Sequence, residues 1–125
     1  MKLQLAIDRV TLEKAIQIIH HTKDSVDIFE IGTSLIKDYG MESVRKIRES
    51  FPEITILADL KTIDEAEYEF EAVYQAGADI ATVMGAAALN TIAICEKVAK
   101  KYNKDFVIDL LEVNNEKLDQ LIQFE

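Results

Sequence analysis

The stretch ITILADL, residues 54–60, is an almost unbroken apolar run with a single aspartate near its end. A short run that is apolar at successive positions is typical of a parallel strand, because both faces of such a strand are buried. Four other runs share this character: Leu3–Ile7, Val26–Ile31, Ile80–Met84 and Phe106–Leu111. The five runs start at residues 3, 26, 54, 80 and 106, so they recur at intervals of 23, 28, 26 and 26 residues.

The segments between these runs have helical spacing of apolar residues, as in Phe70, Val73 and Tyr74. Four signals mark where helices begin or end. The only proline, Pro52, should stop the second helix, and Gly77 should be a left-handed C-cap. Asp64 with Glu67 has the form of a capping box, and Asn114 or Asn115 can cap the last helix.

Strands that alternate with helices at this period predict an α/β fold of the (β/α)₈ TIM-barrel family. The strands are expected in sequential order, with right-handed crossovers and helices on the outside only. The chain would supply about the first five βα units, so residues 1–125 are interpreted as one domain, the N-terminal portion of such a barrel. The ending LIQFE, without a stop signal, favours a chain that is cut short.

Composition limits the class of protein. With 49% hydrophobic and 30% charged residues, 125 residues are typical of one globular domain. No apolar run approaches the roughly 20 residues of a membrane span, and no signal peptide is evident. A single cysteine, Cys95, excludes an internal disulfide and favours a cytoplasmic location. The net charge of −9 argues against a nucleic-acid partner.

Polar residues occur where the predicted strands end, which is the edge that carries the chemistry in parallel α/β folds. They are Asp8, Glu30, Asp59 with Lys61, and Asp109, while Gly85 follows the fourth strand. Asp59 and Lys61 are two apart, so on one strand they should point to the same side. Structural alternatives remain open: Asp8 could cap the first helix, Asp64 could be a plain N-cap, and Asp59 with Lys61 could be an architectural ion pair.

Two other residue types are interpreted as inert. His20 and His21 fall at the end of the first predicted helix, where imidazole suits the helix dipole at the surface. Cys95 lies among apolar residues and is expected in the core. No histidine base, Walker loop or GxGxxG pattern follows any of the predicted strands.

Carboxylates beside a lysine at one edge suit a hard divalent cation, and Mg²⁺ is the expected cofactor. A metal ion and an ammonium group together stabilise negative charge that grows on oxygen, as when a sugar ketone becomes an enediolate. The neighbouring acids should keep Lys61 protonated, so we expect it to act as a cation or proton donor and not as a Schiff-base amine.

The segments LQLAID, VDIFEIGT, ILADLKTID, GADIATVMG and FVIDLL resemble, in order and spacing, the first five strands of the 3-hexulose-6-phosphate synthase family. That family belongs to the orotidine-monophosphate-decarboxylase suprafamily. The D-x-K-x-x-D motif at Asp59, Lys61 and Asp64 is the most specific part of the resemblance. Thr62 and Glu65 depart from the family pattern, which leaves substrate preference open.

The resemblance implies an Mg²⁺-dependent aldol condensation of formaldehyde with D-ribulose 5-phosphate in a homodimer. Glu30 and Asp59 would be metal ligands, and Lys61 would stabilise the enediolate. Asp64 would reach into the partner's site. The substrate-binding candidates are Asp8, Asp109 and Gly85.

Two alternatives stay open. The first is the sister family, 3-keto-L-gulonate-6-phosphate decarboxylase, which carries glutamate on the fifth strand where this chain has Asp109. The second is a non-catalytic fragment, because the family's sixth-strand histidine and its phosphate-binding loops after strands seven and eight are not in this sequence. On that second view, the 125 residues alone would be inactive and would self-associate through the open edges of the sheet.

Overall fold

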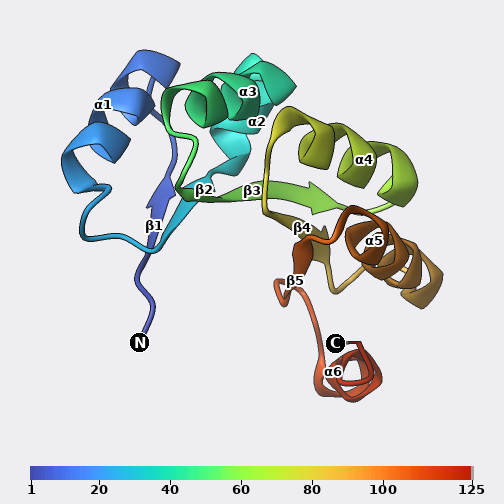
Figure 1. Ribbon diagram of the computed structural model, residues 1–125. Coiled ribbons are helices and arrows are strands. Elements are labelled where there is room, and N and C mark those ends of the chain that lie inside the picture. Colours follow the sequence, from blue (N-terminus) through green and yellow to red (C-terminus); the bar gives the residue numbers. More distant parts are fainter. Residues whose placement is uncertain (125) are drawn as a thin grey trace.

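The computed structural model, which describes residues 1–124, contains a five-stranded parallel sheet in the order β1-β2-β3-β4-β5 (Figure 1). All four strand pairs are parallel, so the predicted sequential order is confirmed. The strands are β1 (Gln4–Ile7), β2 (Ile28–Ile31), β3 (Thr55–Thr62), β4 (Ile80–Met84) and β5 (Asp105–Asp109).

Six helices connect or follow these strands: α1 (Leu12–Thr22), α2 (Thr33–Tyr39), α3 (Met41–Ser50), α4 (Ala66–Ala76), α5 (Leu89–Tyr102) and α6 (Asn115–Leu121). Figure 1 shows α1 to α5 along the outer side of the curving sheet, while α6 follows β5 near the C-terminus. Within residues 1–124, none of these helices has the length and apolar character needed to cross a lipid bilayer.

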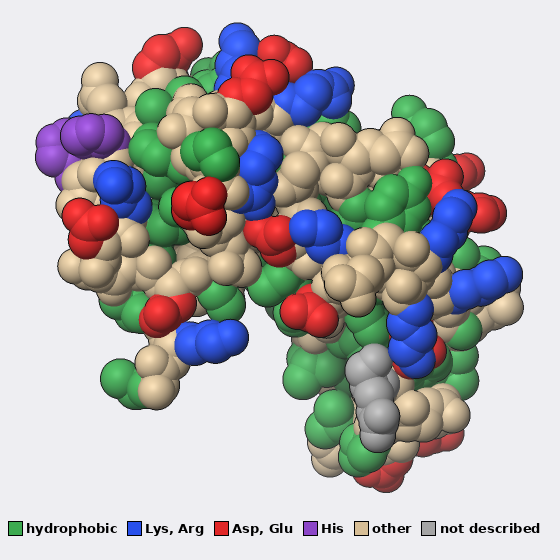
Figure 2. All heavy atoms as spheres, in the orientation of Figure 1, with side chains coloured by type: hydrophobic (Ala, Val, Ile, Leu, Met, Phe, Trp, Pro, Cys, Tyr) green, Lys and Arg blue, Asp and Glu red, His purple; other side chains and the backbone are tan. Residues whose placement is uncertain are grey.

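The core lies between the sheet and its helices. Ile31, Ala58 and Ala81 are neighbours in register on β2, β3 and β4, and all three are buried. Because side chains alternate along a strand, the residues next to these in the sequence point to the opposite, concave face of the sheet. Glu30 and Leu57, which are in register with each other, therefore face away from the helices. In the same view, Figure 2 shows the molecule hollowed between its N-terminal segment and α6.

Most predicted helix ends are confirmed. Helix α3 ends at Ser50, two residues before Pro52. Gly77 follows α4 with φ +110°, which is the left-handed conformation that glycine tolerates best. The Asn114 side chain accepts a hydrogen bond from the Lys117 N–H at 2.8 Å and so caps α6.

Two predictions about helices were incomplete or wrong. The separate helix α2 was not expected; it is only seven residues long, is anchored by the buried Leu35, and ends at Gly40 with φ +61°. The capping box was wrong, because α4 has Glu65 as its N-cap, without a side-chain cap. The Asp64 carboxylate instead accepts the N–H of the next residue, Glu65, at 2.9 Å.

A cluster of charges joins the amino ends of the strands; we call Arg48, Asp79 and Lys104 the amino-edge cluster. Asp79 accepts from Arg48 Nη2 at 2.5 Å and from Lys104 Nζ at 2.7 Å. Arg48 also donates to the backbone carbonyl groups of four residues: Phe51, Pro52, Ile54 and Gly77. The cluster therefore ties the end of α3 to the segments that precede β3, β4 and β5.

Candidate active site

A cavity of about 190 Å³ lies on the concave face of the sheet. All five strands contribute to its wall, which consists of Gln4, Glu30, Leu57, Asp59, Lys61, Thr82, Val107 and Asp109. Four predicted site residues, Glu30, Asp59, Lys61 and Asp109, are thus brought together around one space.

The end of β3 is irregular, and this irregularity shapes the cavity. Ala58 pairs with Ala81 and Thr62 pairs with Val83, so the three residues Asp59–Lys61 stand opposite Thr82 alone. Lys61 adopts φ +52°, a left-handed conformation that is uncommon for a residue with a side chain. Asp59 and Lys61 nevertheless both line the cavity, as predicted from their spacing, while Ala58 and Thr62 are buried away from it.

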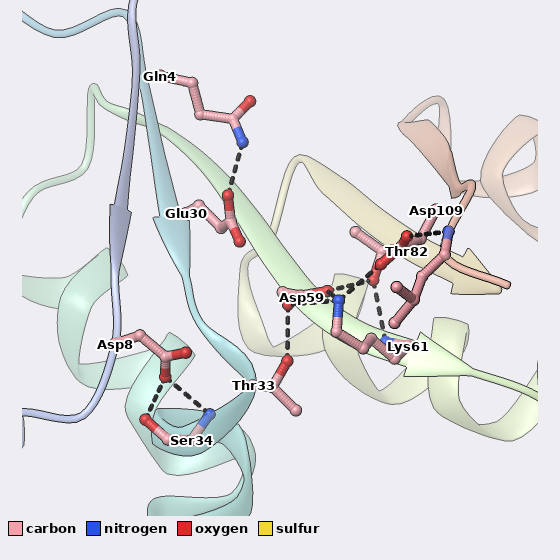
Figure 3. A network of polar contacts seen from close by, with 10 residues as sticks. Gln4, Asp8, Glu30, Thr33, Ser34, Asp59, Lys61, Thr82 and Asp109 are labelled. Carbon is pink, nitrogen blue, oxygen red and sulfur yellow. Dashed lines mark hydrogen bonds and ion pairs between the residues drawn. The ribbon is translucent and has the colours of Figure 1, made fainter.

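The Lys61 ammonium group lies between two carboxylates from different strands (Figure 3). Its Nζ is 2.6 Å from Asp109 Oδ2 on β5 and 3.2 Å from Asp59 Oδ2. The hydrogen bond to Asp109 is the main cause that raises the pKa of Lys61 above its ordinary value. The same bond lowers the pKa of Asp109, so both groups are charged at neutral pH.

Asp59 is the most buried carboxylate of the cavity, with 6% of its surface exposed. Two threonine hydroxyls donate to it: Thr33 Oγ1 to Oδ2 at 2.6 Å and Thr82 Oγ1 to Oδ1 at 2.9 Å. A buried carboxylate is stable when hydrogen bonds and an opposite charge replace its water, and Asp59 has both. Figure 3 shows Thr33 and Thr82 approaching it from two sides.

Glu30 and Asp59, the two predicted metal ligands, both line the cavity. The Glu30 carboxylate accepts from Gln4 Nε2 at 2.6 Å, which orients it from the neighbouring strand. Among residues 1–124, no three or more His, Cys, Asp or Glu side chains are grouped closely enough to hold a metal ion. Two carboxylates with all-oxygen donors do fit Mg²⁺, which commonly uses one or two carboxylates and takes its other ligands from water and substrate.

Asp8 lies at the same edge but outside the cavity wall (Figure 3). Its Oδ1 accepts the N–H of Ser34 at 2.9 Å and also contacts the Ser34 hydroxyl. The bond from that hydroxyl is the main cause that lowers the pKa of Asp8. The suggestion that Asp8 caps the first helix was wrong, because Thr11 caps α1 and Asp8 binds the first turn of α2.

The two remaining predicted residues also lie outside the cavity wall. Gly85 donates its N–H to the carbonyl oxygen of Asp109 at 2.8 Å. A Cβ on Gly85 would come within 2.7 Å of Val113 Cγ2, so the close approach of the chain after β5 requires glycine here. Asp64 is exposed on the loop between β3 and α4.

Three residues of the site were not predicted from the sequence: Gln4, Thr33 and Thr82. Thr82 could have been predicted, because it is a polar residue inside an apolar strand. It lies on the same face of the sheet as Asp109 at the end of the next strand. The predicted placement of the histidines and the cysteine is confirmed: His20 and His21 are exposed, and Cys95 is buried. Burial raises the pKa of the Cys95 thiol to about 12.

Comparison with known proteins identifies the family to which the chain belongs. The family model described as Orotidine 5'-phosphate decarboxylase / HUMPS family matches residues 1–123. The chain is 39% identical over 115 residues to the 3-hexulose-6-phosphate synthase of Bacillus subtilis (strain 168), a match that covers 92% of this chain and 55% of that protein. The chain therefore spans about half the length of the curated relatives it matches.

Two solved structures share the fold. The crystal structure of 3-hexulose-6-phosphate synthase from Salmonella typhimurium matches with a TM-score of 0.95 and 35% identity, covering 98% of this chain and 59% of that one. The 3-keto-L-gulonate-6-phosphate decarboxylase of Vibrio cholerae matches with a TM-score of 0.90 and 29% identity, covering 98% and 58%. The TIM-barrel-type fold predicted from the strand period is confirmed, and the chain belongs to the orotidine 5'-phosphate decarboxylase / HUMPS family.

Proposed function

We propose that this chain carries the catalytic face of a 3-hexulose-6-phosphate synthase, which condenses formaldehyde with D-ribulose 5-phosphate in an Mg²⁺-dependent aldol reaction. The observation that carries the proposal is the Lys61 ammonium group, held by Asp59 and Asp109 in a cavity that Glu30 also lines. Relatives that bear this name, from several bacteria, support the substrate class.

Lys61 is suited to stabilise an enediolate electrostatically. Loss of a proton from C1 of the ketose places negative charge on its oxygens, and a fixed ammonium group lowers the energy of that charge. Asp109 and Asp59 hold Lys61 in place and keep it protonated, since both raise its pKa. The enediolate carbon then attacks the carbon of formaldehyde, and the aldehyde oxygen takes up a proton as the new C–C bond forms.

Glu30 and Asp59 would hold the Mg²⁺ ion. When bound, the ion would supply positive charge beside the sugar oxygens on which negative charge develops. Gln4 orients Glu30, while Thr33 and Thr82 orient Asp59, so both carboxylates are fixed before any ligand arrives. On this proposal Asp64, on its exposed loop, reaches the site of a partner subunit in a homodimer, and Asp8 and Gly85 act near the substrate.

A second candidate is the decarboxylase, because one of its members shares this fold at 29% identity. Asp109 favours the synthase, since the decarboxylase carries a glutamate at this position of the fifth strand. The two activities are separated by substrate: the synthase consumes formaldehyde with ribulose 5-phosphate, and the decarboxylase releases CO₂ from 3-keto-L-gulonate 6-phosphate.

The test uses a hybrid in which this chain replaces the part of the Bacillus subtilis synthase that it matches, which is 55% of that protein. The hybrid should consume formaldehyde only when ribulose 5-phosphate and Mg²⁺ are both present. Asp59→Asn should abolish the Mg²⁺-dependent rate, while Asp24→Asn, which changes an exposed carboxylate in the loop after α1, should not. Release of CO₂ from 3-keto-L-gulonate 6-phosphate, without consumption of formaldehyde, would contradict the synthase proposal and support the decarboxylase.

The isolated 125-residue chain should be measured beside the hybrid. Strands β1 and β5 end the sheet formed by residues 1–124, and unpaired strand edges tend to associate. We expect the isolated chain to show no measurable turnover and to elute above its monomer mass in size-exclusion chromatography. A monodisperse monomer with the turnover of the hybrid would show that five βα units suffice.

A further inference from the structure

We infer that Thr82, in the middle of β4, is a positioning residue that holds Lys61 and Asp59 in their working arrangement. The inference rests on the proposed function for its catalytic meaning, and on contacts within this chain for its geometry. Thr82 is 6% exposed and contacts both residues through one hydroxyl group.

The register of the sheet explains why a side chain is needed at this point. Between the pairs Ala58–Ala81 and Thr62–Val83, β3 has three residues and β4 has only Thr82. The ladder of backbone hydrogen bonds is interrupted there, as in any bulge. The N–H of Lys61 donates to Thr82 Oγ1 at 3.0 Å, so a side-chain oxygen replaces the missing backbone acceptor.

The hydroxyl of Thr82 has two roles that require both a donor and an acceptor. It accepts from the Lys61 N–H and donates to Asp59 Oδ1 at 2.9 Å. A hydroxyl has one hydrogen and two lone pairs, so it can do both at once, whereas the isosteric valine can do neither. The single group thereby links the backbone of Lys61 to the carboxylate of Asp59.

The backbone of Lys61 is where this link matters most. At φ +52°, a lysine is in a sparsely populated conformation that persists only when its surroundings hold it. That conformation sets the start of the side chain whose Nζ lies 2.6 Å from Asp109 and 3.2 Å from Asp59. Without the Thr82 hydroxyl, the Lys61 N–H loses its acceptor. The backbone from which the Lys61 side chain extends is then no longer held in place.

Thr62 provides a matched control on the same strand. It is also buried, with 1% exposed, and its hydroxyl also donates to a carboxylate, that of Glu69 on α4. Thr62→Val therefore removes a comparable buried hydrogen bond, but on the side of β3 that faces α4. It does not line the cavity.

The first experiment measures amide hydrogen exchange at Lys61 in the 125-residue chain by NMR. Thr82→Val should accelerate exchange at Lys61 by roughly tenfold, as expected for the loss of about one hydrogen bond. Thr82→Ser should keep the wild-type rate, and Thr62→Val should leave Lys61 protected relative to the rest of the sheet. If Thr82→Val does not fold, Thr82→Cys, whose thiol bonds more weakly, should accelerate exchange in the same direction. Equal exchange at Lys61 in the Thr82→Val and Thr62→Val proteins would overturn the inference.

The second experiment measures steady-state kinetics in the hybrid. Thr82→Val should lower kcat by roughly tenfold or more with KM unchanged. A misplaced ammonium group loses contact with the negative charge that develops only in the transition state, and binding of the substrate is not affected. Thr82→Ser should restore kcat, and Thr62→Val should not lower it. An equal fall in kcat for both valine variants would mean that Thr82 acts only on stability. A hybrid without activity when Thr82 is intact would overturn the proposed function, while exchange at Lys61 would still decide the role of Thr82.

Discussion

The two ends of the sheet each pair aspartate with basic side chains, but they are built differently. In the amino-edge cluster, Arg48 and Lys104 converge on Asp79, which also accepts the N–H of Ile56 at 2.9 Å. Arg48 directs its other donors to backbone carbonyl groups of four residues. The cations at this end bind chain segments to one another.

At the carboxyl end one cation stands between two carboxylates. Lys61 contacts Asp59 and Asp109, and 35% of its side chain is exposed at a cavity. An ammonium group has three donors, so two carboxylate partners leave a third for a ligand. Its backbone is left-handed, whereas neither Arg48 nor Lys104 has a positive φ. The cations of the amino-edge cluster are used within the protein, whereas the site that we propose to be catalytic has a strained backbone and an unused donor beside a cavity.

Removal of the cation should separate the two ends most clearly. Lys61→Met in the hybrid should lower kcat roughly 100- to 1000-fold, the range for loss of one group that stabilises developing negative charge. Lys104→Met, which removes the lysine paired with Asp79, should leave kcat near wild type. Similar rates for the Lys61→Met and Lys104→Met proteins, measured by formaldehyde consumption, would abolish the distinction.

Stability should respond in the opposite sense. Arg48→Met removes one of the two cations that bind Asp79 and the Arg48 donors to four carbonyl groups, so we expect the free energy of unfolding to fall by about 2–3 kcal/mol. Lys101→Met breaks a pair with Glu71 in which the lysine is well exposed to water, so it should cost much less than Arg48→Met. Urea denaturation of the 125-residue chain measures both. If Arg48→Met costs no more than Lys101→Met, the amino-edge cluster is not architectural.

The smallest expected effect is the pH dependence of the Lys61–Asp109 pair. The pKa of Asp109 is lowered below its ordinary 3.8, so its contribution to stability is complete above that value and is lost as the pH falls through the lowered pKa. The pKa of Lys61 is raised above 10.5, so its contribution is complete below that value and is lost as the pH rises through the raised pKa.

Asp109→Asn should therefore reduce the free energy of unfolding by about 1 kcal/mol, a modest value because both side chains are partly exposed to water. The difference from wild type should be constant between these two pKa values and should shrink at either extreme. Urea denaturation at a series of pH values measures it. A difference that grows toward acid pH would mean that Asp109 is not held in its charged form by Lys61.

Much of the fold could be predicted from the sequence, because apolar strands at a regular interval leave few alternatives to a parallel sheet. Helix α2 could not, since its seven residues, Thr33–Tyr39, are too few to show a clear helical period. The capping box failed at Asp64 because the loop turns one residue later than its pattern indicated, which places Glu65 at the N-cap.

The site was predicted in part, for a physical reason. Parallel strands bring their carboxyl ends to one edge, so Glu30, Asp59, Lys61 and Asp109 could be expected together. The bulge at Asp59–Lys61 could not, because it depends on a register shift against β4 that leaves no mark in β3 alone. Asp8 and Gly85 satisfied the same strand-end rule, yet the first binds Ser34 and the second packs under Val113.

The most direct test of the central claim is deuterium exchange at C1 of ribulose 5-phosphate in D₂O, without formaldehyde. Formation of an enediolate removes a C1 proton, so the hybrid should incorporate deuterium at C1, as followed by proton NMR. We predict that Lys61→Met slows this exchange roughly 100-fold or more, while Lys104→Met leaves it unchanged. Exchange that is equally fast in the Lys61→Met protein would contradict the assignment of Lys61 as the group that stabilises the enediolate.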